Sequence, residues 1–212
     1  MGNKVSPLAN RIPLTKRWQS QWFANHKQFG EKIAEDLMIR KAIEKSYAQQ
    51  GAISKVDIAH RQADIEVTIH SARPGVLIGR QGQGIAEVRN MLEKKIGRQV
   101  KVEIREVRRP EADAQLVAQS IGGALARNIA YRRVCKQALE KAMSAGAKGI
   151  KILVAGRLGG SEIARSQKFT SGSLPSTSLK RNIDFVSYAL QTSYGTIGIK
   201  VWIYKDAEPE EA

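Results

Sequence analysis

The sequence predicts an α+β protein of two domains, and three observations lead to this prediction. The chain has 212 residues, 42% of them hydrophobic, so it supplies apolar material for two cores of roughly 100 residues each. Helix-like and strand-like periodicities alternate up to residue 108. Beyond the step from Arg109 to Pro110, one long helical region precedes a run of strands.

The first domain, expected over 38–108, combines helices with three strands. The expected elements, in chain order, are a helix over 29–50, strands over 53–59 and 64–70, a short helix over 76–78, a helix over 83–96 and a strand over 99–107. The apolar side of the first helix is predicted to contain Ile33, Leu37 and Ile43. The strand over 64–70 alternates apolar and polar residues, which is typical of a strand with one buried face.

An N-terminal extension is expected over 1–37, where Pro7 and Pro13 interrupt regular structure. Trp18 and Trp22 are four positions apart, which predicts a short helix that presents both rings on one face. Stacking of bases on exposed rings is one interpretation. We favour the other, in which the rings hold the extension on the core, because large aromatic side chains mostly bury.

The second domain, expected over 109–206, begins with a long helical element over 111–146. Apolar residues recur there at four-residue spacing, and Gly122 and Gly123 indicate either a kink or a close helix contact. An antiparallel or mixed sheet follows, with strands expected over 150–156, 162–170, 182–193 and 196–204 and a hairpin at Tyr194 and Gly195. Residues 207–212 are expected to form an acidic tail.

The charge balance indicates a polyanionic partner. Lys and Arg number 35 against 20 Asp and Glu, which gives a net charge of +15 and a pI near 10.1. Such an excess contributes nothing to a fold but attracts nucleic acid, and less commonly a membrane surface or an acidic protein. No apolar run reaches the roughly 18 residues that a membrane helix needs, and the N-terminus lacks a secretory pattern. We therefore expect a soluble, cytoplasmic protein.

Catalysis is not indicated by the ionisable residues. The single cysteine, Cys135, is expected to be a buried or half-buried side chain, although Arg132, Arg133 and Lys136 would lower the pKa of its thiol. His60 and His70 fall in strand contexts typical of structural residues. No carboxylate pair or Cys/His set has the spacing of metal ligands. The sequence predicts no enzyme, no metal, no cofactor and no small-molecule substrate.

The segment VLIGRQGQGI, residues 76–85, contains the strongest local motif, Gly79-Arg80-Gln81-Gly82. Glycines without a Cβ let a sugar-phosphate backbone approach closely, and the helix that follows directs free N–H groups at it. Arg80 adds a positive charge, and Ile78 and Ile85 supply an apolar floor for bases. Gly-x-x-Gly between two helices, followed by a strand, is typical of the type II KH domain, which binds single-stranded nucleic acid. The spacing fits neither a dinucleotide fingerprint nor a P-loop.

The whole chain resembles the family of the universal small-subunit ribosomal protein three, in its bacterial form. The segments that carry the resemblance are WFANHKQF (22–29), TIHSARPGVLIGRQGQGI (68–85), EVRRPEADAQLVAQSI (106–121), GAKGIKILVAGRLGGSEIAR (146–165) and SYGTIGIKVWIYK (193–205). Where the family usually has basic and aromatic residues after that fourth segment, this chain has a polar stretch over 167–182. Some RNA contacts of that loop are therefore expected to be weaker.

The resemblance implies a structural protein of the small-subunit head that binds rRNA and neighbouring head proteins and lines the channel through which mRNA enters. In the family, a basic trio on the long helix grips mRNA, and the matching residues are Arg132, Arg133 and Lys136. Arg157 and Arg165, in and after a glycine-rich turn, are further expected RNA contacts. The alternative is a KH regulator outside the ribosome, which would bind short single-stranded motifs by itself.

Overall fold

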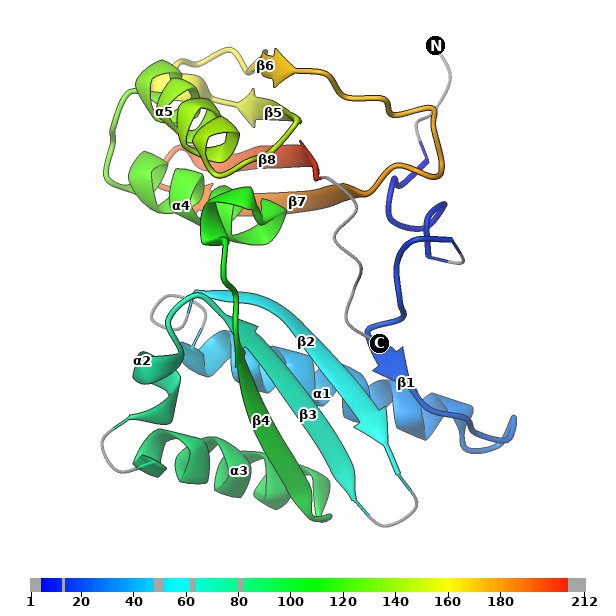
Figure 1. Ribbon diagram of the computed structural model, residues 1–212. Coiled ribbons are helices and arrows are strands. Elements are labelled where there is room, and N and C mark those ends of the chain that lie inside the picture. The colour runs from blue at the N-terminus through cyan, green and yellow to red at the C-terminus, as the bar shows by residue number, and fades with distance from the viewer. Residues whose placement is uncertain (1–4, 13, 48–51, 62–63, 80–81, 206–212) are drawn as a thin grey trace. The chain divides into compact units, whose positions relative to one another are not determined.

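The computed structural model describes residues 5–12, 14–47, 52–61, 64–79 and 82–205 (Figure 1). The chain forms two compact units. We call Trp18–Arg108 the N-terminal unit, and residues 5–17 together with 109–205 the C-terminal unit. The boundaries expected at residues 37, 108 and 206 stay predictions, but the structure groups residues 18–37 with the unit that follows them and residues 5–17 with the C-terminal unit.

The N-terminal unit has helices on one face of a four-stranded sheet. Its elements are β1 (Ser20–Gln21), α1 (Phe29–Tyr47), β2 (Ile53–His60), β3 (Ile65–Ser71), α2 (Pro74–Ile78), α3 (Gln83–Ile96) and β4 (Val100–Glu106). The sheet order is β1-β2-β3-β4, in which only the β2–β3 pair is antiparallel. Along β3, Ile65, Val67 and Ile69 are buried and the residues between them are not, as the alternation predicts. The predicted order α-β-β-α-α-β is confirmed, with β1 added.

The buried face of α1 differs from the one expected. Ile43 is buried, but Ile33 is 39% exposed and Leu37 is 50% exposed. The side of α1 that packs into the core contains instead Asp36, Ile39, Ala42 and Ile43. Two apolar stripes are present on this helix, and periodicity cannot tell which of them faces the sheet.

The two tryptophans before α1 do not lie on a helix, so that prediction is wrong. The segment contains β1, which pairs with β2. The Trp22 indole N–H donates to Asp36 Oδ2 at 3.0 Å, and its ring lies 5.4 Å from that of Phe29. Trp22 therefore holds this segment on the N-terminal unit, as we favoured, whereas Trp18 is 68% exposed.

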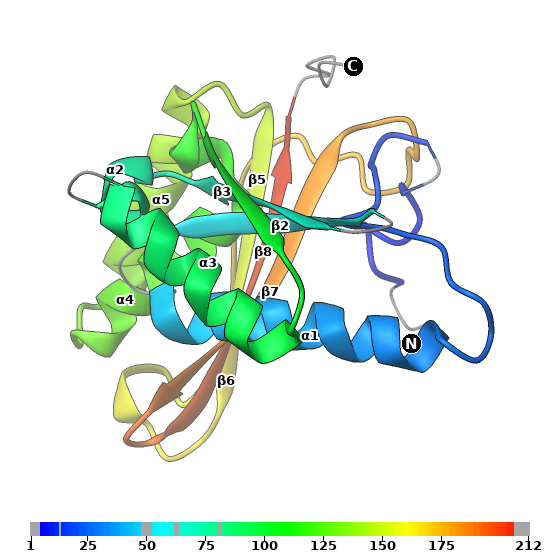
Figure 2. The ribbon, with the colours of Figure 1, turned by 90° about the horizontal axis from the view of Figure 1, so that it is seen from below.

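The C-terminal unit has two helices packed on an antiparallel sheet (Figures 1 and 2). Its elements are η2 (Pro110–Ala112), α4 (Ala114–Ala126), α5 (Tyr131–Ser144), β5 (Gly149–Gly156), η3 (Leu158–Gly160), β6 (Arg165–Gly172), β7 (Ile183–Thr192) and β8 (Gly195–Tyr204). The sheet order is β6-β5-β8-β7 with every pair antiparallel. The hairpin predicted at Tyr194 and Gly195 joins β7 to β8.

The single long helical element expected over 111–146 is two helices. Asn128 has φ of 58°, a left-handed conformation that ends α4 before α5 begins. Asp113 caps the start of α4, since its Oδ1 accepts from the amides of Gln115 and Leu116. A Cβ on Gly122 would lie 2.7 Å from Cε1 of Tyr188. Gly122 therefore marks a close contact, between α4 and β7, and not a kink.

Arg11 joins the start of the chain to the loop between β6 and β7. Its side chain is only 1% exposed, yet it donates to the carbonyl oxygens of Arg181, Ser178 and Ser176 at 2.9, 2.9 and 3.1 Å. It also donates to the carbonyl of Pro7 at 3.0 Å. Charged groups are rarely buried unless hydrogen bonds satisfy them. The Arg11 guanidinium therefore fixes residues 5–17 to the C-terminal unit.

Candidate RNA-binding surfaces

The Gly-x-x-Gly loop joins α2 to α3. Gly79 has φ of 68° and ψ of −176°, a region that is essentially restricted to glycine. Gly82 adopts the left-handed conformation, with φ of 79° and ψ of 8°, and α3 begins at the next residue. Arg80 and Gln81, the predicted contacts between the two glycines, lie outside the described residues. Both glycines therefore have positive φ, a backbone conformation that the sequence reasoning did not predict.

Gly84 is a third required glycine, which the sequence reasoning did not single out. A Cβ at this position would collide with the carbonyl oxygen of Leu77, because α2 and α3 pass too close together. A Cβ on Gly79 would in turn lie 3.0 Å from the amide nitrogen of Gly84. The pattern Gly-x-x-Gly-x-Gly was visible in the sequence, but only the helix contact shows why the last glycine matters.

The start of α3 is suited to an anionic ligand. Its first turn contains no acidic residue, and Gly82 supplies no side-chain cap, so the helix dipole and the first amides are available to a phosphate. Apolar surface adjoins the loop on α2, where Val76 is 48% and Ile78 is 37% exposed. Phosphate-binding amides beside apolar surface are what a KH domain uses to hold a single strand.

The basic trio lies on the first turns of α5. Arg132, Arg133 and Lys136 are exposed, while Val134 and Cys135 between them are buried in the core. Within the described part of the chain, none of the three cations forms an ion pair. The charges are therefore not neutralised by neighbouring carboxylates of the described chain.

Tyr131 positions Arg132 of the trio, although the sequence reasoning did not identify it. Its hydroxyl bridges Arg132 Nε, at 3.1 Å, and Gln167 Oε1 on β6, also at 3.1 Å. The Arg132 guanidinium lies 5.8 Å from the centre of the Tyr131 ring, and that ring packs against Phe169. Arg132 is thus held at the junction of α5 and β6.

Arg165 lies on β6, the strand that Tyr131 contacts, whereas the guanidinium of Arg157 is held by backbone carbonyls. Arg165 begins β6 on the same face as Gln167, the residue that holds Tyr131, and is exposed. Arg157 donates to the carbonyl oxygens of Ser161 at 3.0 Å and Tyr194 at 3.2 Å. Arg165 is therefore exposed at the start of β6, on the side of the strand that faces Tyr131, and Arg157 holds the turn after β5 against the β7–β8 hairpin. We call Arg132, Arg133, Lys136 and Arg165 the α5 basic surface.

Cys135 is fully buried, and burial raises the pKa of its thiol to about 11. The expectation that the neighbouring cations lower this pKa is wrong, because their charges lie in solvent while the thiol lies in the core. The thiol therefore stays protonated at neutral pH and cannot serve as a nucleophile.

The histidines of β2 and β3 are structural, as expected. His60 Nε2 lies 2.7 Å from Asp36 Oδ1, and His70 Nε2 lies 3.0 Å from Asp57 Oδ2. Burial alone would raise the pKa of Asp36, but hydrogen bonds from His60, Ser20 and Trp22 bring it below its ordinary value. Among the described residues, no group of three or more His, Cys, Asp or Glu side chains is arranged to hold a metal ion.

The fold and the loop define the class of the N-terminal unit as a KH domain, and the comparisons agree. The KH domain profile matches residues 38–112, and the profile of the ribosomal protein S3 C-terminal domain matches residues 121–203. The small ribosomal subunit protein uS3 of Carboxydothermus hydrogenoformans is 45% identical over 97% of this chain and 92% of its own length. The uS3 proteins of Finegoldia magna and Chlamydia trachomatis are each 44% identical, over 97% and 96% of this chain and 84% and 90% of their own lengths.

This chain belongs to the family of the small ribosomal subunit protein uS3. It is therefore a structural, RNA-binding component of the small ribosomal subunit that takes part in translation, and it is not an enzyme. A KH regulator outside the ribosome would not account for the match of the C-terminal unit to a ribosomal family. None of the helices in the described ranges is both long and apolar enough to cross a bilayer.

Proposed function

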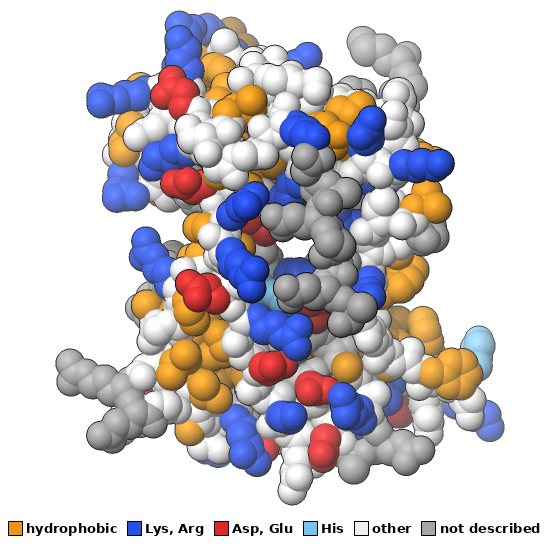
Figure 3. Space-filling view, viewed as in Figure 1, with side chains coloured by type: hydrophobic (Ala, Val, Ile, Leu, Met, Phe, Trp, Pro, Cys, Tyr) orange, Lys and Arg blue, Asp and Glu red, His pale blue; other side chains and the backbone are white. Residues whose placement is uncertain are grey.

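We propose that this protein sits in the head of the cytoplasmic small subunit, binds rRNA there and contacts mRNA where the message enters. The observation that carries the mRNA contact is the α5 basic surface, whose four cations are exposed on the first turns of α5 and at the start of β6. Phosphate contacts by Lys and Arg need no particular sequence, so they suit a strand whose sequence changes as it moves. Lys and Arg side chains are spread over the face seen in Figure 3, which fits further backbone contacts.

The rRNA contact is assigned to the Gly-x-x-Gly loop and the start of α3. Gly79 and Gly82 leave the backbone amides accessible, and Arg80 and Gln81 lie between them in sequence. The flexible geometry of glycine and the helix N-terminus both favour a sugar-phosphate backbone as the ligand. Arg157 contributes less to RNA binding than Arg165, because two backbone carbonyls already hold its guanidinium.

Neighbouring head proteins are the partners proposed for the apolar stripe of α1. Phe29, Ile33 and Leu37 are 51%, 39% and 50% exposed at four-residue spacing, which places them along one side of the helix. Exposed apolar stripes of this kind mark protein contacts more often than RNA contacts. The stripe therefore complements the basic surfaces, which take the RNA.

The mRNA contact is tested in reconstituted small subunits programmed with an mRNA that carries 4-thiouridine downstream of the decoding site. The test variant is Arg132→Gln, Arg133→Gln and Lys136→Gln combined. The control is Lys41→Gln, Lys45→Gln and Lys141→Gln, which removes three exposed charges from other parts of α1 and α5. We expect crosslinking of mRNA to this protein to fall in the test variant alone. Equal crosslinking in both variants would sink the assignment of the α5 surface.

A further inference from the structure

The sheet of the C-terminal unit has one face that neither α4 nor α5 covers. Side chains alternate between the two faces of a strand, and directly paired residues share a face. Beyond the buried pair Ile183 and Tyr204, the uncovered face carries successive rows of paired residues. The first row is Thr170, Lys151, Trp202 and Phe185, and the second is Lys168, Leu153, Lys200 and Ser187. We call these eight residues the open sheet face.

The charged residues of the open sheet face are all lysines. It contains Lys151, Lys168 and Lys200, and neither of its two rows contains an acidic residue. The corresponding face in the N-terminal unit is different. There Lys55, Lys101 and Arg105 alternate with Asp57, Glu66 and Glu103, and ion pairs join them at 3.3 to 3.7 Å. The sheet face of the N-terminal unit thus carries both signs of charge, whereas the charged residues in the two rows of the open sheet face are all lysines.

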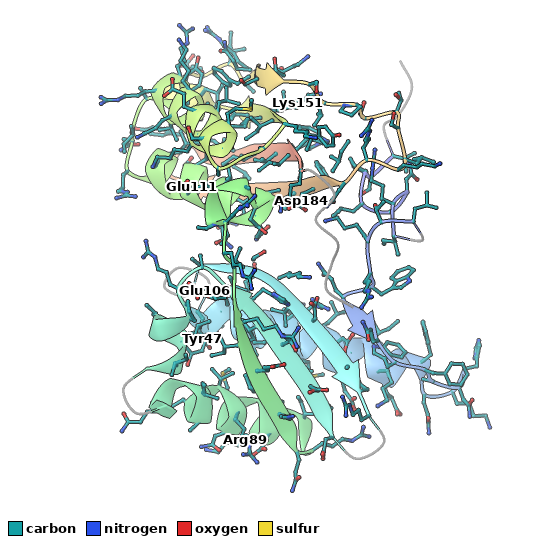
Figure 4. The ribbon with its side chains drawn as sticks, viewed as in Figure 1. Tyr47, Arg89, Glu106, Glu111, Lys151 and Asp184 are labelled. Atoms are coloured by element: carbon teal, nitrogen blue, oxygen red, sulfur yellow. The ribbon has the colours of Figure 1, made fainter. Side chains whose placement is uncertain are left out.

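Aromatic rings lie among these lysines. The rings of Phe185 and Trp202 are 5.1 Å apart between centroids and inclined by 36°, and both are half-buried. Lys151, labelled in Figure 4, places its Nζ 4.7 Å from the centre of the Trp202 ring. Cation–π contacts at solvent-accessible sites are weak, and bases stack on the same kind of aromatic ring.

We propose that the open sheet face binds an unpaired segment of the ribosomal RNA by stacking bases on Trp202 and Phe185. A four-stranded sheet with surface aromatics and surrounding cations is the arrangement by which RRM domains hold single-stranded RNA. The exposed ammonium groups of Lys168 and Lys200 complement the negative charge of a polyanion. The site is separate from the Gly-x-x-Gly loop, which lies in the other unit, and from α5, which covers the opposite face of this sheet.

The nature of the contact favours rRNA over mRNA as the ligand. Stacked bases are held in place, whereas a message must slide past the protein at every step of translation. Contacts to phosphate alone permit sliding, and stacking on rings does not. The proposal rests on the membership of this chain in the small subunit, but it does not depend on the roles given above to the loop or to the α5 basic surface.

Binding is measured with the full-length chain and a labelled single-stranded 12-nucleotide RNA, by fluorescence anisotropy. Every protein carries Gly82→Asp, which is expected to weaken RNA binding by the KH loop. Lys168→Gln with Lys200→Gln is the test pair, and Lys41→Gln with Lys45→Gln on α1 is the control of equal charge. We expect the test pair alone to weaken binding and to make the slope of log K against log salt shallower by about 0.7 for each lost phosphate contact. Identical slopes for the two pairs would overturn the proposal.

Stacking is tested at Trp202 itself. Trp202→Phe keeps a flat ring and is expected to bind within a few-fold of the parent, whereas Trp202→Leu is expected to lose about tenfold or more. Thermal unfolding of both variants is the control that tests whether each is folded. If the folded Leu variant binds as well as the Phe variant, the rings do not stack on bases.

The identity of the ligand is tested in assembled subunits. A benzoylphenylalanine placed at Ser187, an exposed position of the open sheet face, is photoactivated in subunits with bound mRNA. An adduct on rRNA supports the proposal. An adduct mainly on mRNA or on a neighbouring ribosomal protein overturns it, and either result leaves the assignments of the loop and of α5 intact.

Discussion

Replacing Gly82 by Asp separates RNA binding from folding. Gly82 is left-handed, with φ of 79°, but a Cβ built there meets no atom within 4 Å. The left-handed conformation costs an ordinary residue about 1–2 kcal/mol, and Asp and Asn tolerate it better than most. We therefore expect Gly82→Asp to lower the free energy of unfolding by about 1 kcal/mol or less. The same change at Gly79 would cost more, because its backbone region admits only glycine.

The loss of RNA affinity follows from Coulomb's law. A carboxylate at residue 82 would lie about 6 Å from a phosphate bound at the start of α3, which costs about 0.7 kcal/mol at the dielectric constant of water and about 2.8 kcal/mol at an effective value of 20. These energies correspond to a loss of roughly 3-fold to 100-fold in affinity. The cost lies in the electrostatics, so it should shrink as salt rises.

Filter binding to small-subunit rRNA at about 0.1 M salt measures the affinity, and urea unfolding measures the stability. Gly82→Asn is the matched control, because it has the same shape as Asp without the charge. We expect Asp to bind more weakly than Asn while the two unfold at similar urea concentrations. The reasoning is refuted if Gly82→Asp binds like the parent chain, or if Asn weakens binding as much as Asp does.

Three further predictions concern stability, each measured by chemical unfolding. Gly84→Ala should destabilise the N-terminal unit by about 1–3 kcal/mol, because its Cβ overlaps the Leu77 carbonyl; a fully stable variant would mean that α2 shifts freely. Arg11→Met should destabilise the C-terminal unit by about 2–4 kcal/mol, because the carbonyl oxygens of Arg181, Ser176 and Ser178 lose their hydrogen-bond donor. Hydrogen exchange of the N-terminal unit should stay as slow as in the parent chain. Asp184 accepts from the Ala114 amide and pairs with Lys205 at 3.3 Å. Burial would raise the pKa of Asp184, but Lys205, Lys16 and that amide hold it below its ordinary value, so its contribution is present above about pH 4 and is lost as the pH falls through the lowered pKa. Asp184→Asn should therefore cost about 1–3 kcal/mol at pH 7 and much less near pH 3; an equal cost at both pH values would contradict this sign.

The local sequence pattern was sufficient to predict the order of helices and strands in the KH domain and the position of the Gly-x-x-Gly loop. Alternation along Ile65, Val67 and Ile69 specifies which side of β3 is buried, because a slip of one residue would reverse every side chain. Gly79 and Gly82 were identifiable because their spacing, between two helices and before a strand, is itself a local pattern of the sequence. The excess of basic residues indicated a polyanion from composition alone, since net charge does not depend on the fold.

The predictions that were wrong concern features for which the local sequence fits two structures equally well. Helix α1 has two apolar stripes, and the sheet and α3 selected the one that contains Ile39 and Ile43. The helical pattern over 111–146 continues through Asn128, whose left-handed backbone divides it into α4 and α5. The pKa of Cys135 was misjudged because nearby cations in sequence point to solvent while the thiol points into the core.

The sequence by itself determined most of the helices and strands, the KH loop and the basic character of this protein, because each depends on neighbours within a few positions or on composition. Only the tertiary structure decided which distant residues meet. It joined Arg11 to a loop about 165 positions away, set Tyr131 against Gln167 and placed three lysines and two aromatic rings on one uncovered sheet face. Those contacts depend on strand register and helix packing, which residues far apart in the chain fix together.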